Sequence, residues 1–191
     1  MPPTHNRPQS ASMLTQENRL ASRGSKTPRV FRMPRRHDEL LSFVAHFGAH
    51  VTNAATKCNL EDVALRAVTA SRRDPSLARM LPVFLFRVRD SLNLSELTAK
   101  AVERGCASRL GYFLEVASKV SSVRTFRPAV ATLRQHAHAE RPVFLFARTE
   151  NHPFEALLAH ENTPKDARRW GLLTSTPLDS FSSYFNKVSS L

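Results

Sequence analysis

Residues 74–93, DPSLARMLPVFLFRVRDSLN, combine a helix start signal with a long helical apolar pattern. Asp74 followed by Pro75 is typical of an N-cap residue and a proline at the first helical position. The apolar residues that follow recur every three or four positions: Leu77, Met80, Leu81, Phe84, Leu85, Val88 and Leu92. The segment is therefore predicted to be mainly helical, with Pro82 either kinking the helix or starting a second one.

The pentapeptide PVFLF occurs in this segment at residues 82–86 and again at residues 142–146. The second copy has no 3.6-residue pattern around it, and the prolines at 142 and 153 confine it to a short run. A short buried strand or an extended segment is predicted there. Because the polar and turn residues around the two copies do not align, the repetition indicates shared composition and not a duplication.

Further helices are expected on both sides of the segment. Asp38 to His50 carries one apolar face, with Gly48 a position at which the helix can end early. Residues 59–74 have Asn59 as N-cap, acidic residues in the first turn and Arg72 and Arg73 in the last turn. Residues 127–140 are predicted to contain a short helix, and Thr163–Pro164 and Thr176–Pro177 are each predicted to be an N-cap followed by a first-position proline.

A helix pair is predicted between the two PVFLF copies. Asn93 or Ser95 caps the first helix, and Gly105 closes it as the C′ residue. The second helix runs from about Ala107 to Val120 and should bury Leu110, Phe113, Leu114 and Ala117. These apolar faces favour a mainly helical single domain over residues 37–191, with at most one or two short strands.

The charge of the chain points to an acidic partner. The net charge is +12 and the sequence pI is about 11, which favours nucleic acid or an anionic membrane surface as the partner. Of the 28 basic residues, 22 are arginine. Such a bias fits phosphate recognition by forked guanidinium groups, and it also fits the codon usage of a G+C-rich genome, which we favour.

Residues 1–36 hold much of this charge. They contain eight Lys or Arg residues and one acid, a net charge of +7, together with five prolines. Such a segment buries too little apolar surface to offset the entropy of ordering it, so we expect a disordered basic arm. The arm either contacts an anionic partner or only keeps the protein in solution.

The other basic clusters are Arg72–Arg73, Arg87–Arg89 and Arg168–Arg169, the last beside Trp170. Trp170 is expected in the core with Leu172 and Leu173. The residues predicted to contact nucleic acid are Arg23, Lys26, Arg29, Arg32, Arg35, Arg36, Arg72, Arg73, Arg168 and Arg169.

The sequence contains no signature of an enzyme. No nucleophile elbow, phosphate loop or dinucleotide-binding motif is present. His46 and His50 have the i, i+4 spacing of two metal ligands, but HFGAH lacks the general base of HExxH, and His136, His138 and Glu140 would not converge on a helix. We expect no metal, no cofactor and no catalytic residue, and we rank a metal-dependent hydrolase last.

Cysteine usage and hydropathy set the expected location. Two cysteines, Cys58 and Cys106, are too few for a disulfide framework, and no apolar run reaches the ~18 residues that span a bilayer. The protein is therefore predicted to be cytoplasmic and without a membrane span.

The stretch NLSELTAKAVERGCASRLGYFLEVASKV, residues 93–120, resembles the C-terminal region of AbiEi-type antitoxins, the transcriptional regulators of abortive-infection toxin–antitoxin systems. The pattern of that family is matched by Leu97, Ala101, Gly105, Arg109, Leu110, Gly111, Leu114 and Glu115. The resemblance implies a helical interaction module that binds DNA or a nucleotidyltransferase-type toxin. Members of the family open with a winged-helix DNA-binding domain, where this chain has the basic arm and one or two short helices.

Taken with the charge of residues 1–36, this resemblance favours a non-enzymatic protein that binds DNA or RNA, with a role in transcription regulation or as an antitoxin. The alternative is a helical protein whose partner is another protein and which makes no contact with nucleic acid.

Overall fold

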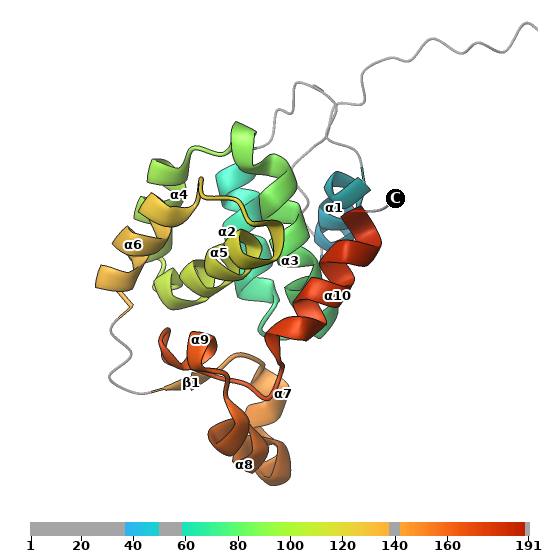
Figure 1. Ribbon diagram of the computed structural model, residues 1–191, viewed down its shortest axis with the longest axis vertical. Helices are drawn as coiled ribbons and strands as arrows, with labels where there is room; N and C mark the ends of the chain where they lie inside the picture. The colour runs from blue at the N-terminus through green and yellow to red at the C-terminus, as the bar shows by residue number, and fades with distance from the viewer. Residues whose placement is uncertain (1–36, 50–58, 138–141, 190–191) are drawn as a thin grey trace, which may run out of the picture.

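The computed structural model describes residues 37–49, 59–137 and 142–189, and within these ranges the protein is mainly helical (Figure 1). The predicted fold class is confirmed. The elements are α1 (His37–Ala49), α2 (Leu60–Ala70), α3 (Pro75–Val88), the 3₁₀ turn η2 (Arg89–Ser91), α4 (Leu94–Glu103), α5 (Ala107–Ser121), α6 (Arg127–Gln135), β1 (Val143–Phe144), α7 (Ala147–Glu150), α8 (Pro153–Asn162), α9 (Lys165–Arg168), β2 (Leu172–Leu173) and α10 (Leu178–Ser189).

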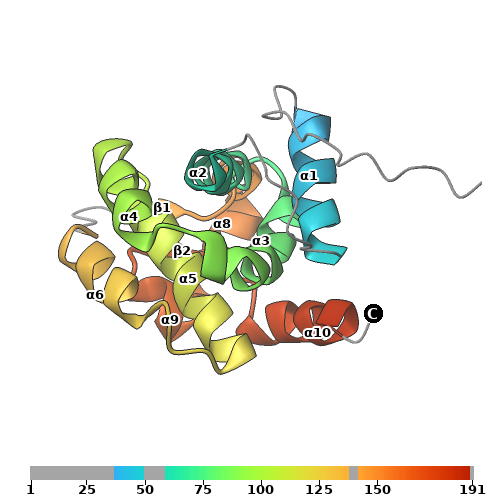
Figure 2. The ribbon, with the colours of Figure 1, turned by 90° about the horizontal axis from the view of Figure 1, so that it is seen from above.

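Helix α3 is the centre of the fold, with α1, α2, α5 and α10 packed around it (Figure 2). Its apolar residues at three- and four-residue spacing bury their side chains against all four neighbours. The helix continues through Pro82 as one element, so a second helix does not begin there. Asp74 caps it as predicted, and its Oδ1 accepts hydrogen bonds from the backbone N–H groups of Ser76 (2.8 Å) and Leu77 (3.3 Å).

The Asp74 cap is expected to matter for stability because α3 carries contacts to four helices. Asp74→Ala should lower the free energy of unfolding by about 1 kcal/mol, since two N–H groups at the helix start lose their acceptor. Asp74→Asn keeps an acceptor oxygen and removes only the charge, so it should retain most of that stability. Urea unfolding followed by circular dichroism measures both variants. Equal losses in the two would show that the carboxylate charge is the stabilising feature and not the cap.

The predicted helix pair at residues 93–120 is confirmed as α4 and α5. Asn93, and not Ser95, caps α4, since its Oδ1 accepts from the backbone N–H of Glu96 at 3.1 Å. Gly105 follows the C-cap residue with φ of +65°, a left-handed conformation that favours glycine. Leu110, Phe113, Leu114 and Ala117 are fully buried, as expected.

Several predicted helix ends were wrong by a few residues. Helix α2 ends at Ala70, so Arg72 and Arg73 lie in the turn after it and not in its last turn. Helix α1 agrees with its prediction and continues through Gly48 to Ala49. Pro164 and Pro177 each lie one residue before the first helical residue of α9 and α10. Thr163 does not cap α9 because its hydroxyl donates to the Ala159 carbonyl at the end of α8 and accepts from the N–H of Thr174 at 3.1 Å.

The second PVFLF copy is extended, as predicted, and differs from the helical first copy. Its β1 pairs in parallel with β2, with Val143 opposite Leu172 and Phe144 opposite Leu173. The strand is less buried than predicted. Leu145 is fully buried, but the Val143 side chain is 46% exposed because β1 lies at the surface of a two-stranded sheet.

The two strands, α7, α8 and α9 lie together at one end of the molecule, below the other helices (Figure 1). Trp170 attaches this end to α5. Its side chain is fully buried, as expected, and it packs on Gly111, where the absence of a Cβ leaves room for the indole ring. Its Nε1–H donates to Glu115 Oε2 at 2.7 Å.

Candidate nucleic-acid interface

A groove of about 920 Å³ lies where α1, the C-terminal half of α2, the end of α4 and the start of α7 meet. We call it the arginine groove. Four arginines line it and no acidic side chain does, among the residues that the structure describes. Its described lining consists of Leu40, Leu65, Arg66, Thr69, Ala70, Arg72, Arg73, Arg104 and Ala147.

The course of the backbone at the end of α2 places the arginines. Helix α2 turns its apolar face to the core and leaves Arg66 on its polar face. After Ala70 the chain makes a turn, with the buried Ser71 hydroxyl donating to the Val68 carbonyl at 2.7 Å. This turn carries Arg72 and Arg73 to the surface, and the Arg72 carbonyl accepts from the N–H of Ala147 at 2.8 Å, which fixes α7 beside it.

Two of the groove arginines are held by one carboxylate each. Arg72 Nη2 lies 2.8 Å from Glu150 Oε2, and Arg104 Nη2 lies 2.6 Å from Asp62 Oδ1. The two arginine side chains remain 47% and 45% exposed. Since a guanidinium has five N–H donors, a single carboxylate leaves donors that can reach an anion from solvent.

Arg73 differs from both. Its side chain is exposed, and within the part of the chain that the structure describes its guanidinium has no hydrogen bond or ion pair. It is therefore available to bind an anion without breaking an existing contact.

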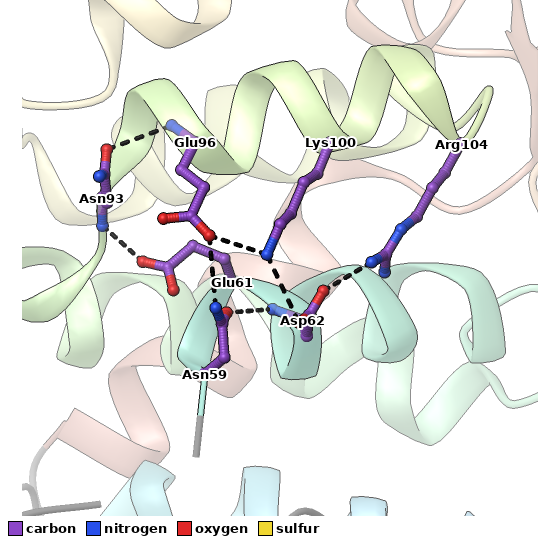
Figure 3. Close-up of polar contacts among 7 residues, drawn as sticks. All are labelled: Asn59, Glu61, Asp62, Asn93, Glu96, Lys100 and Arg104. Carbon is purple, nitrogen blue, oxygen red and sulfur yellow. Dashed lines mark hydrogen bonds and ion pairs between the residues drawn. The ribbon is translucent and has the colours of Figure 1, made fainter. Parts of the chain in front are cut away.

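The position of Arg104 depends on a polar network between α2 and α4 (Figure 3). Partial burial acts to raise the pKa of Asp62, but Arg104 and Lys100 outweigh it and hold that pKa below its usual range. The buried Glu61 carboxylate accepts from the backbone N–H of Asn93 at 2.6 Å and joins the start of α4 to α2. The network comprises Asn59, Glu61, Asp62, Asn93, Glu96, Lys100 and Arg104.

Arg109 on α5 adds a charge close to Arg72. Its Nη2 donates to the Phe144 carbonyl at 2.9 Å. Burial lowers the pKa of Arg109 and the neighbouring Arg72 lowers it further, although arginine stays charged at any physiological pH. Cys106 and Glu150 act in the opposite direction and partly offset these two effects.

Of the residues predicted to contact nucleic acid, Arg72 and Arg73 lie in the groove. Arg168 and Arg169 do not line it; they lie at the end of α9, where Arg168 Nη2 donates to the His160 carbonyl at 3.3 Å. The remaining six, Arg23, Lys26, Arg29, Arg32, Arg35 and Arg36, lie outside the described residues.

Arg169 belongs to a cluster around Glu115, whose side chain is only 12% exposed. Glu115 receives Arg169 at 2.7 Å, Arg134 at 3.1 Å and Lys119 at 3.2 Å, besides the Trp170 indole. Asp166 also pairs with Arg169, at 2.6 Å. These contacts give Arg169 a role in attaching α9 to α5.

The Arg87–Arg89 cluster is likewise occupied with internal contacts. Arg87 Nη2 donates to the Val188 carbonyl of α10 at 2.8 Å. The Arg89 guanidinium carbon lies 4.5 Å from the centroid of the Phe86 ring, and its Nη2 lies 3.2 Å from Asp90.

Arg66, Arg104 and Arg109 were missed by sequence reasoning. None of the three has a second basic residue beside it in the sequence. The polar face of α2 was a signal for Arg66, but only the packing of α4 and α5 against α2 brings the other two near Arg72.

The histidine pairs considered as metal ligands cannot be compared with the structure. The His46 side chain, His50, His138 and Glu140 lie outside the residues described, as does Cys58. Among the residues that are described, no three His, Cys, Asp or Glu side chains are grouped as metal ligands, and no helix is long and apolar enough to cross a membrane. Cys106 is buried, which raises the pKa of its thiol.

Comparison with known protein families and curated proteins gives no match for the sequence, and the fold matches no solved structure.

Proposed function

We propose that this protein binds DNA or RNA through the arginine groove together with the basic residues of 1–36, and that it acts as a regulatory or antitoxin-like binding protein without enzymatic activity. The observation that carries the proposal is the groove itself. It gathers Arg66, Arg72, Arg73 and Arg104 without an acidic side chain in its described lining, which is the charge pattern that phosphate backbones require.

The first described residue of the chain, His37, lies close to this groove along α1. Leu40 lines the groove, and it lies three residues after His37, the first residue of α1, a rise of about 4.5 Å along the helix. Because residues 1–36 and the groove are both positively charged, the segment repels the groove and does not provide its ligand. A polyanion would neutralise both, which makes the two parts one binding surface.

The chemistry expected of this surface is backbone recognition. Half-exposed guanidinium groups bind phosphate oxygens through two parallel N–H donors, and such contacts position a nucleic acid without reading its sequence. Binding should therefore depend steeply on salt concentration and weakly on sequence.

A protein partner, such as a nucleotidyltransferase-type toxin, is the second candidate. The observation in its favour is a separate groove of about 490 Å³ between α4 and α6, within and next to the segment that resembles the antitoxins. Its described lining holds no Asp, Glu, Lys or Arg and is rich in small side chains, which suits a protein surface better than a phosphate. The described lining residues are Leu94, Ser95, Thr98, Ala99, Val102, Pro128, Ala129, Thr132 and His136.

Arg73→Ala tests the proposal, with Arg127→Ala as a matched control. Both arginines are exposed and have no ion pair in the described structure, but Arg127 begins α6, away from the groove. Arg73→Ala should reduce the slope of log K against log salt by about 0.9 for duplex DNA, the loss of one neutralised phosphate, whereas Arg127→Ala should leave the slope unchanged. Fluorescence anisotropy of a labelled oligonucleotide over a salt series measures both slopes.

Equal effects of the two substitutions would mean that net charge, and not the groove, attracts the nucleic acid. If the unaltered protein binds neither DNA nor RNA in low salt, the nucleic-acid proposal fails and the protein partner takes its place.

A further inference from the structure

Phe154 is exposed to an extent unusual for its size. Its side chain is 71% exposed in the first turn of α8, and Leu157, one turn later, is 54% exposed. A phenyl ring in solvent forgoes the free energy gained by burial, which makes the exposed Phe154 ring a candidate contact for a partner.

The position of Phe154 links it to the arginine groove. Helix α7, between the two, has Ala147 in the groove lining and Glu150 paired with Arg72. Only the turn at Asn151 and His152 separates α7 from α8, and Phe154 lies four residues after Glu150, at most about 14 Å away along the chain. The contacts between α7 and α8 keep α8 next to α7, at the end of the molecule that also holds the two strands and α9 (Figure 1).

We propose that the arginine groove and Phe154 together bind single-stranded nucleic acid, with phosphates on the groove arginines and a base stacked on the Phe154 ring. This inference rests on the proposed function and names its substrate class. A base in a single strand has a free face for an aromatic ring, whereas the bases of a duplex already stack on one another. A concave groove also admits one backbone more deeply than it admits a rigid double helix.

The surroundings of Phe154 favour this partner over a protein. The exposed large apolar side chains of α8 are Phe154 and Leu157, and Glu155 between them pairs with Arg148 at 3.5 Å. A stable protein interface needs about 800 Å² from each partner with a well-packed apolar centre, far more than Phe154 and Leu157 provide. A single base needs only the face of one ring.

Phe154→Ala in the full chain is the first test. With a labelled oligothymidine of roughly 20 nucleotides, long enough to cover a site of about 4–16 nucleotides, the affinity should fall about fivefold or more, the loss of one stacked base. Affinity for a duplex of the same length should not change. Phe154→Tyr keeps an aromatic face and should bind like the unaltered protein, whereas Phe154→Leu should bind like Phe154→Ala.

Leu157→Ala separates stacking from a general apolar contact. It removes the neighbouring exposed side chain and should leave single-strand affinity unchanged. If Leu157→Ala weakens binding as much as Phe154→Ala, or if Phe154→Leu has no effect, the surface is an apolar docking patch and the stacking proposal is wrong. If Phe154→Ala has no effect while Arg73→Ala still weakens binding, the stacking proposal fails and the nucleic-acid function stands. Absence of any binding in low salt overturns both.

Discussion

Trp170→Ala is expected to lower the free energy of unfolding by about 3–5 kcal/mol, the cost of deleting a large buried ring. The side chain is fully buried, its Nε1–H donates to Glu115 at 2.7 Å, and the Arg134 guanidinium lies 5.3 Å from its ring centroid. The substitution would leave a cavity between α5 and the end of the molecule that contains α9, and it would remove one donor from Glu115.

Gly111→Ala tests the same contact from the other side. A methyl group at position 111 would overlap the six-membered ring of Trp170, so either the ring or α5 has to move. Overpacking of this kind costs about 1–3 kcal/mol and sometimes more. In a Trp170→Ala background the methyl group meets empty space, and Gly111→Ala should cost little or should stabilise helix α5, since alanine is the better helix former.

The measurement is a double-mutant cycle by urea unfolding with four chains: unaltered, Gly111→Ala, Trp170→Ala and the double variant. Trp170→Phe is the control that keeps an aromatic ring but lacks the N–H donor, and it isolates the contribution of the Glu115 hydrogen bond. If the two losses in the free energy of unfolding simply add in the double variant, Gly111 and Trp170 do not interact. In that case the packing of Trp170 on Gly111 does not attach α9 to α5.

Deletion of residues 1–36 is expected to have the largest effect on nucleic-acid binding. If five or six of the eight basic residues in that segment neutralise phosphates, they contribute roughly −5 to the slope of log K against log salt. Most of that slope should disappear on deletion, so that affinity for duplex DNA falls steeply at low salt. The part of the slope that remains should come from the groove, and Arg73→Ala should reduce it further.

The deletion should not destabilise the helical fold, because the core described here is built from residues 40 onwards. Thermal unfolding of the full chain and of the deletion variant should give similar midpoints. A full-length variant with glutamine at the eight basic positions of 1–36 separates charge from length and should behave like the deletion. If the deletion variant binds duplex DNA as tightly as the full chain, the segment plays no part in binding.

The helices were largely predictable because their signals are local. Asp74–Pro75, Asn59, Asn93 and Gly105 set element ends through hydrogen bonds within one turn of the chain, and the apolar spacing of residues 77–92 set the buried face of α3. The wrongly predicted start of α9 depends in part on a residue from farther along the chain. Thr163 does not cap α9 because its hydroxyl closes α8 and meets Thr174, eleven residues later in the chain.

The candidate site was predictable only in part. Sequence reasoning found Arg72 and Arg73 because they are adjacent, and it placed Arg168 and Arg169 in the same class for the same reason. The structure separates the two pairs. Arg169 is committed to Glu115, 54 residues earlier in the chain, whereas Arg104, 32 residues after Arg72, joins it in the groove.

The sequence by itself determined the helical class, the apolar face of α3 and the excess of positive charge. Apolar periodicity and capping residues act over a few neighbouring residues, and net charge depends only on composition. Only the tertiary structure decided which arginines lie in one groove, which are paired with carboxylates, and that Phe154 stays exposed. The reason is that charge and burial act through space. A guanidinium binds whatever anion packing brings within about 3 Å, and the order of residues in the chain does not fix that neighbour.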